Sequence, residues 1–110
     1  MKKSIQTIAL ALMAIFALAL SAEAKEIKTV EIQTSANCGM CKKSIEKNLN
    51  DAEGVMKADL DLDDKVCTVK YDASKTDADK IRKVISDTGY DADDVKKNKK
   101  AHSKLPKCCQ

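Results

Sequence analysis

Two cysteines three residues apart, Cys38 and Cys41, stand between a segment with strand character and a segment with helical character. If the second segment is a helix that begins at this motif, its first turn holds both sulfur atoms on one side of the chain. Two such thiols can bind one soft metal ion or close into one disulfide bond. Which of the two occurs at Cys38-Gly39-Met40-Cys41 therefore largely decides the function of the protein.

The first 24 residues have the order of a secretory signal peptide. Lys2 and Lys3 precede an uncharged apolar run over residues 8–20, and Ala22–Ala24 has the small-x-small form of a cleavage site. The run is shorter than the roughly 20 residues that a membrane-spanning helix needs. We therefore expect cleavage after Ala24 and a secreted or periplasmic protein, with no stable membrane insertion after cleavage.

The rest of the chain is long enough for one small domain and a basic tail. Residues 25–95 carry 12 basic and 16 acidic side chains, whereas residues 96–110 carry 6 lysines and no acidic side chain. Short basic tails without apolar anchors bind membranes only weakly, and export argues against nucleic acid as a partner. We place the domain at residues 25–97 and interpret residues 98–110 as a solvated, cysteine-containing tail.

The hydrophobic pattern predicts six elements in the order strand, helix, strand, strand, helix, strand. Alternating apolar residues indicate strands, and apolar residues three and four apart indicate helices. The expected strands cover residues 26–34, 55–62, 66–71 and 92–97, and the expected helices cover residues 41–50 and 76–88. This order is that of a split β-α-β unit, a ferredoxin-like α+β sandwich. We expect a four-stranded antiparallel sheet with two helices on one face.

Several side chains have a defined place in this pattern. Thr76 is expected to cap the second helix, and Gly89 is expected to end it in the left-handed conformation. Met56 is expected to point inward with the other apolar residues of its strand. Cys67 is in phase with the inward-facing Val69, so we interpret it as a small buried hydrophobic residue.

The chain resembles the heavy-metal-associated domain family over residues 26–95. The resemblance is carried by Cys38-Gly39-Met40-Cys41 with the helical segment that follows, and by Glu53–Val55, Val69–Asp72 and Thr88–Asp91. The family includes small copper chaperones, the N-terminal modules of metal ATPases and periplasmic mercury-binding proteins. The resemblance implies the ferredoxin-like βαββαβ fold, with Cys38 and Cys41 as the metal ligands.

The resemblance also bears on two further positions, Ala36 and Tyr90. The family usually has Met two residues before the first cysteine, as a core anchor rather than a ligand, and this chain has Ala36 there. The loop after the second helix lies beside the metal loop in the family, which would bring Tyr90 close. Tyr90 would then shield or tune the site, or it would only pack at the edge of the core.

The chemistry of two thiolates also points to a soft metal. A helix N-terminus can lower a cysteine pKa from ~8.5 to about 3.5–7.5, and Cys41 lies at such an end. Soft thiolates favour Cu(I), and Cu(I) and Hg(II) accept two sulfur ligands, whereas structural Zn(II) prefers four ligands. We expect Cu(I), with Hg(II), Ag(I), Zn(II) or Cd(II) as the other candidate ions.

The expected function is that of a Cu(I) chaperone or scavenger without enzymatic activity. It would bind one ion through Cys38 and Cys41 and pass it by thiolate exchange to a metal-transporting ATPase or another metal-accepting protein. We expect a monomer, with a metal-bridged dimer as the alternative.

The sequence leaves three alternatives to a Cu(I) carrier. The first is a periplasmic Hg(II)-binding protein that uses the same two cysteines. The second is a thiol-disulfide oxidoreductase, but thioredoxin-like folds place a proline beside the active disulfide and the one proline here is Pro106. The third is an inert staple, and a disulfide across so short a loop stabilises little.

Cys108 and Cys109 lie outside the family pattern. Three interpretations compete: auxiliary metal ligands that fold back toward Cys38 and Cys41, a separate thiol site, or a disulfide to another cysteine or chain. We favour a metal or thiol role because exposed free thiols are prone to oxidation. We interpret His102 as solvated rather than as a ligand, since it stands alone in a lysine-rich segment.

Overall fold

One antiparallel sheet of three strands forms the base of the fold. The computed structural model describes residues 26–110, so the predicted signal peptide lies outside the described residues. Within them the strands are β1 (Ile27–Gln33), β2 (Val55–Asp61) and β3 (Val66–Asp72), in the order β1-β3-β2. The central strand places Cys67 opposite both Ile32 and Leu60, so these positions share the inner face of the sheet.

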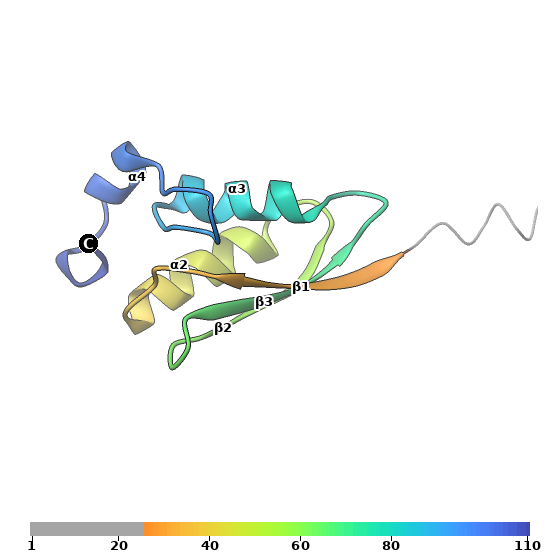
Figure 1. Ribbon diagram of the computed structural model, residues 1–110, viewed down its shortest axis with the longest axis horizontal. Coiled ribbons are helices and arrows are strands. Elements are labelled where there is room, and N and C mark those ends of the chain that lie inside the picture. Colours follow the sequence, from red (N-terminus) through yellow and green to blue (C-terminus); the bar gives the residue numbers. More distant parts are fainter. Residues whose placement is uncertain (1–25) are drawn as a thin grey trace, which may run out of the picture.

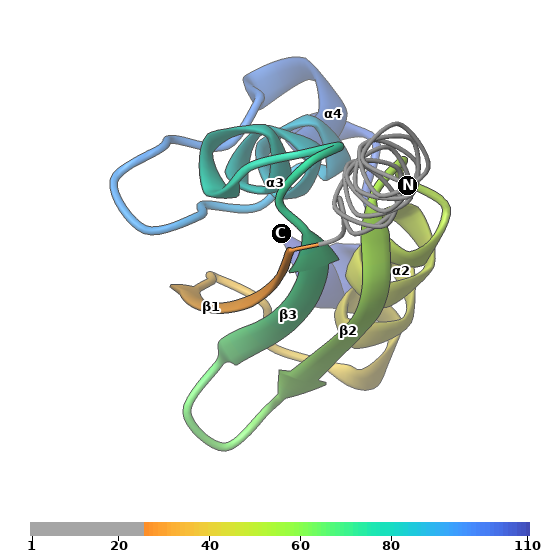
Figure 2. The ribbon, with the colours of Figure 1, turned by 90° about the vertical axis from the view of Figure 1, so that its right-hand side faces the viewer.

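Two helices cover one face of this sheet, as Figure 1 shows. They are α2 (Gly39–Asn50) and α3 (Ala78–Thr88), and they pack against each other. The view along the strands in Figure 2 shows both helices on the same side of the sheet. The α+β order of the elements up to α3 is therefore the predicted one. No helix within residues 26–110 has the length and apolar character needed to cross a membrane.

The core lies between the sheet and the two helices. Its largest buried aliphatic side chains come from every one of these elements and are fully or almost fully buried: Ile32, Ile45, Leu49, Leu60, Val69, Ile81 and Ile85. Burying one such side chain contributes about 1.5–3 kcal/mol. This core fixes the position of α2, and with it the position of the two cysteines at the start of that helix.

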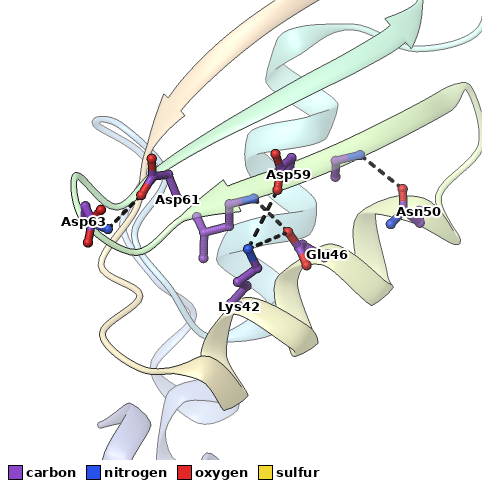
Figure 3. A network of polar contacts seen from close by, with 8 residues as sticks. Lys42, Glu46, Asn50, Asp59, Asp61 and Asp63 are labelled. Carbon is purple, nitrogen blue, oxygen red and sulfur yellow. Dashed lines mark hydrogen bonds and ion pairs between the residues drawn. The ribbon is translucent and has the colours of Figure 1, made fainter.

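Side chains of α2 also hold the free edge of β2. Glu46 Oε2 accepts a hydrogen bond from the backbone N–H of Leu60 at 2.8 Å, and Asn50 Oδ1 accepts one from Ala58 at 3.1 Å (Figure 3). Lys42 Nζ lies 3.8 Å from Glu46 Oε2. These bonds satisfy N–H groups that an edge strand would otherwise leave unpaired. They also fix the direction of α2 along the sheet.

The expected fourth strand at residues 92–97 is not formed. Ala92 makes isolated bridges to Thr34 and to Val95, and the chain turns at Asp93, which has φ 54°. The backbone N–H of Asp93 donates to Gln33 O, and Asp93 Oδ1 accepts from the backbone N–H of Gln33, both at 2.8 Å. The carboxylate thus takes the place that a strand backbone would occupy at the end of β1.

Two local predictions were wrong and one is confirmed. The cap of α3 is Asp77, whose side chain accepts from the backbone N–H of Lys80 at 2.8 Å, rather than Thr76. Met56 is 57% exposed because the register between β2 and β3 shifts at this position, and such a bulge turns the side chain outward. Gly89 ends α3 in the left-handed conformation, with φ 115°, as predicted.

Candidate metal centre

The two cysteines of the motif lie at the first turn of α2. Cys38 is the N-cap residue, with extended backbone (φ −152°, ψ 169°), and its carbonyl accepts from the backbone N–H of Lys42 at 3.1 Å. Cys41 is fully buried, whereas Cys38 is partly exposed. Their Sγ atoms are 3.1 Å apart. The helix start therefore brings the two sulfurs together, as the spacing predicted.

The last residues of the chain reach the same place. Figure 1 shows the C-terminal segment at the end of the molecule where α2 begins. Cys38 Sγ lies 3.2 Å from the Sγ atoms of both Cys108 and Cys109. Cys109 is joined to Cys41 by a disulfide, with a Cα–Cα distance of 5.8 Å. Four sulfur atoms thus gather at the start of α2, and we call these four cysteines the sulfur cluster.

The tail is folded against α3, unlike the solvated tail expected from the sequence. It contains α4 (Lys99–Ser103) and the 3-10 turn η1 (Lys107–Cys109). The backbone N–H of Asn98 donates to Ser86 O at 3.0 Å, and Leu105 packs against the core. These contacts hold the segment that carries the two terminal cysteines.

His102 takes part in this anchoring. Its Nδ1 atom lies 3.0 Å from the carbonyl oxygen of Gly89, at the end of α3. Among the described residues, the group with metal-ligand spacing consists of Cys38, Cys108 and Cys109 and does not include His102. The contact gives the histidine a structural role where the sequence had suggested a solvated one.

The free thiols of the cluster differ in acidity. The backbone N–H of Cys41 and the side chain of Cys108 stabilise the Cys38 thiolate and lower the pKa of Cys38. The same contact with Cys38 raises the pKa of Cys108, with burial and the negative charge of Cys38 acting in the same direction. Of these two thiols, Cys38 therefore ionises first and is the better nucleophile and metal ligand.

Tyr90 lies at the border between the core and the cluster. Its side chain is 1% exposed, and its hydroxyl group has no hydrogen-bond partner among the described residues. Burial raises the pKa of Tyr90, and the negative charges of Cys38 and Cys108 raise it further. The residue therefore belongs to the core and also lies near the sulfurs, so both interpretations made from the sequence apply to it.

Two other residues for which the sequence carries an expectation are buried. Cys67 is fully buried in the sheet, as predicted, and burial together with the charges of Glu46 and Asp59 raises its pKa to about 12. Ala36 is fully buried at the position where the family usually has Met.

Met40 also lies near the sulfur cluster and is not among the site residues predicted from the sequence. Its Sδ atom lies 3.9 Å from Cys108 Sγ, and the side chain is 54% exposed. The signal that could have identified it is a thioether placed between the two cysteines of the motif, because thioethers are soft ligands like thiolates.

The cluster can exist in two chemical states. With the disulfide between Cys41 and Cys109 closed, Cys38 and Cys108 are the free thiols. A dithiol reductant that supplies two electrons and two protons would convert the disulfide into two thiols and become a disulfide itself. Four thiols would then be available at the start of α2. Metal binding through Cys41 requires this reduced state, since a disulfide sulfur has no thiolate to offer.

Comparison with known proteins gives a consistent result. Residues 35–91 match the family described as heavy-metal-associated domain. The copper chaperone CopZ of Staphylococcus aureus (strain JH9) is 39% identical over 67 residues, which cover 61% of this chain and 94% of that protein.

Two solved structures are similar over the same region. Oxidized MerP from Ralstonia metallidurans CH34 is 28% identical, with a TM-score of 0.59 over 61% of this chain and 94% of MerP. The N-terminal domain of a potential copper-translocating P-type ATPase from Bacillus subtilis, in the Cu(I)-loaded state, is 25% identical, with a TM-score of 0.59 over 62% of this chain and 86% of that domain. The family match, the order of the elements and the cysteines at the start of α2 agree. The chain therefore belongs to the heavy-metal-associated domain family.

Proposed function

We propose that the protein is an exported Cu(I) carrier that binds one ion through the thiolates of Cys38 and Cys41 and performs no catalysis. It passes the ion by thiolate exchange to a metal-transporting ATPase or another metal-accepting protein. Cu(I) suits two soft sulfur ligands at a site that a partner can approach. The similarity to a copper chaperone and to a P-type ATPase domain supports both the ion and the class of partner.

The observation that carries this proposal is the pair of sulfurs at the N-terminus of α2. The Sγ atoms of Cys38 and Cys41 lie 3.1 Å apart, and the pKa of Cys38 is lowered by the backbone N–H of Cys41 and by Cys108. A thiolate is therefore present at Cys38 at a pH where an ordinary thiol stays protonated. Partial exposure of Cys38 lets a thiol of a partner approach the ion from outside.

Export places a condition on this function. An oxidising compartment favours disulfides, and the closed Cys41–Cys109 disulfide removes one of the two proposed ligands. The carrier is therefore active only after a dithiol has reduced this disulfide. The dithiol is oxidised to its own disulfide, and Cys41 and Cys109 become thiols. The proposal of export is supported by the charged, apolar and small-residue order of residues 2–24.

Competition with a chromogenic Cu(I) chelator tests the proposal. The reduced protein is titrated under anaerobic conditions beside the double variant Cys38→Ser/Cys41→Ser and the control Cys67→Ala. We expect one Cu(I) per chain for the wild type and the control, and loss of tight binding in the double variant. Unchanged affinity in the double variant would refute the assignment of the two ligands.

Hg(II) is the second candidate ion, because the chain is also similar to MerP. Hg(II) accepts the same pair of thiolates, so affinity in vitro does not separate the two ions. Metal analysis of the protein isolated under reducing conditions, from cells exposed to both metals, separates them. Predominant copper supports the Cu(I) carrier, and predominant mercury supports the Hg(II)-binding protein.

A further inference from the structure

The sulfur cluster contains more sulfur than either a two-ligand site or one disulfide requires. Cys38 Sγ has three sulfur neighbours, those of Cys41, Cys108 and Cys109, at 3.1–3.2 Å. Cys108 Sγ and Cys109 Sγ are 3.7 Å apart. A disulfide accounts for one pair only, so the convergence of the other two cysteines on the same point needs a separate explanation.

The fold holds the terminal cysteines at this point. The carbonyl oxygen of Ser86 accepts from the backbone N–H of Asn98, and the carbonyl oxygen of Gly89 contacts His102 Nδ1, both at 3.0 Å. Gln110 Nε2 donates to the carbonyl oxygen of Leu105 at 2.7 Å and so closes the last turn. Because the tail is ordered before a metal arrives, bringing its ligands to the ion costs little additional entropy.

We propose that the tail completes a four-thiolate site, in which the reduced protein binds one divalent ion of tetrahedral preference, Zn(II) or Cd(II). The ligands are Cys38, Cys41, Cys108 and Cys109. This site rests on the proposed function for its first two ligands, and the two tail cysteines are what it adds. Two cysteines alone make a poor site for such ions, whereas four thiolates form a complete one.

The geometry fits an ion of this kind. Four sulfurs at the usual Zn–S distance of about 2.3 Å from a tetrahedral ion stand about 3.8 Å apart. The separation of Cys108 and Cys109 is already 3.7 Å, whereas Cys38 Sγ has to move about 0.6 Å away from its three sulfur neighbours. The sulfurs of Cys41 and Cys109 have to separate by about 1.7 Å once their bond is reduced. A divalent ion with four thiolates carries two negative charges, and the segment 96–110, which contributes two of the ligands, contains 6 lysines and no acidic residue.

The chemical steps balance with one reductant. A dithiol transfers two electrons and two protons to the Cys41–Cys109 disulfide and leaves as a disulfide. The ion then binds as the cysteine thiols release their protons to solvent. A closed four-sulfur site has no open position for an incoming thiol. The protein loaded in this way therefore retains a divalent ion, whereas an ion on Cys38 and Cys41 alone remains open to transfer.

Titration with Cd(II) tests the proposal, because thiolate-to-cadmium charge-transfer absorbance counts the thiolates bound. The reduced wild type is compared with Cys108→Ser/Cys109→Ser and with Cys67→Ala, which removes a cysteine outside the cluster. We expect saturation at one Cd(II) per chain for the wild type and for Cys67→Ala. We expect about half of that absorbance for the tail variant, because two of the four thiolates are gone.

Zn(II) affinity and a milder variant complete the test. Competition with a zinc chelator should show binding weaker by roughly 100-fold in Cys108→Ser/Cys109→Ser. Cys108→Ser alone, at an exposed position, should keep about three quarters of the absorbance, so a folding defect of the double variant would not hide the result. Equal absorbance and Zn(II) affinity in wild type and tail variants would overturn the four-thiolate site.

Two other readouts separate this inference from the proposed function. One Cd(II) per two chains would indicate a metal-bridged dimer and would also overturn the proposal. Cu(I) binding by Cys108→Ser/Cys109→Ser is expected to persist through Cys38 and Cys41. If the tail variant keeps Cu(I) binding and has unchanged Cd(II) absorbance, the four-thiolate site fails while the Cu(I) carrier stands.

Discussion

Cys38 Sγ and Cys109 Sγ lie 3.2 Å apart, although 71 positions of sequence separate the two residues. The first caps α2, and the second lies in η1 at the end of the chain. A contact over this separation requires the whole domain to be folded between them. The state of the metal centre is therefore linked to the docking of the tail. Substitutions where the tail contacts the end of α3 should change the positions or the oxidation state of the sulfurs.

Gly89→Ala should disturb this docking. A Cβ atom at Gly89 would lie 3.0 Å from Leu105 Cδ1 and 3.1 Å from the backbone of His102, and φ 115° is strained for alanine. We expect a loss of about 1–3 kcal/mol in the free energy of unfolding, measured by denaturant titration. We also expect a smaller fraction of Cys41–Cys109 disulfide, measured by mass spectrometry of non-reduced peptides.

Gly39→Ala is the matched control for Gly89→Ala. A Cβ atom at Gly39 meets nothing within 4 Å, and the residue lies in α2 where alanine is the better helix former. This variant should keep the disulfide and the stability of the wild type. Equal disulfide content and stability in both alanine variants would contradict the role assigned to the contact between Gly89 and the tail.

Alkylation of the disulfide-bonded protein should begin at Cys38. The pKa of Cys38 is lowered by hydrogen bonds, that of Cys108 is raised, and that of Cys67 is raised to about 12. Because the thiolate reacts, the rate at Cys38 should remain high below the usual thiol range of about 8.5 and fall only as the pH passes through its lowered pKa. Peptide mapping after short exposure to iodoacetamide at several pH values measures this order. Faster labelling of Cys108 or Cys67 would contradict it.

Asp93→Asn should destabilise the turn that replaces the fourth strand. Partial burial opposes ionisation of Asp93, but the hydrogen bonds from Arg82 and from the backbone of Gln33 hold its pKa below the usual range. A lowered pKa in the folded state means that the carboxylate stabilises the fold above the ordinary carboxyl pKa of about 3.9. We expect a cost of about 1 kcal/mol near neutral pH. That difference should vanish as the pH falls through the lowered pKa.

Asp87→Asn provides the comparison for Asp93→Asn. Asp87 Oδ2 pairs with Lys83 Nζ at 3.0 Å, but both side chains are more than half exposed. Exposed ion pairs of this kind contribute little, so this variant should match the wild type in urea titrations at every pH. A loss of stability for Asp87→Asn as large as that for Asp93→Asn would contradict this account. It would mean that removal of any surface negative charge, rather than loss of the hydrogen bonds of Asp93, explains the effect.

Tyr90→Phe should stabilise the metal-free protein. The Tyr90 hydroxyl is buried without a hydrogen-bond partner among the described residues, and an unsatisfied buried group costs about 1–3 kcal/mol. Removing it should raise the midpoint of thermal unfolding. A lower midpoint would show that the hydroxyl has a partner in solution, and a change in Cu(I) stoichiometry would show that it acts at the metal.

Local patterns in the sequence are sufficient to predict the three strands that form, both main helices and the approach of Cys38 to Cys41. These patterns do not predict the places where a single residue changes the direction or the register of a strand. The bulge at Met56 and the turn at Asp93 depend on pairing with β3 and with the end of β1, and alternation of apolar residues carries no information about either.

The prediction of a solvated tail was wrong for a related reason. Residues 98–110 have no amphipathic period, and their place is set by contacts to Ser86 and to Gly89 that are distant in sequence. The two terminal cysteines were visible as unusual residues. Their arrival at Cys38 could not be derived without the fold.

The most direct test of the Cu(I) carrier is the X-ray absorption spectrum of the reduced protein loaded with one Cu(I). The account predicts a first coordination shell made of sulfur alone. It also predicts that this shell is lost in Cys38→Ser/Cys41→Ser and retained in Cys67→Ala. A shell of nitrogen or oxygen atoms in the wild type, or an unchanged sulfur shell in the double variant, would contradict it.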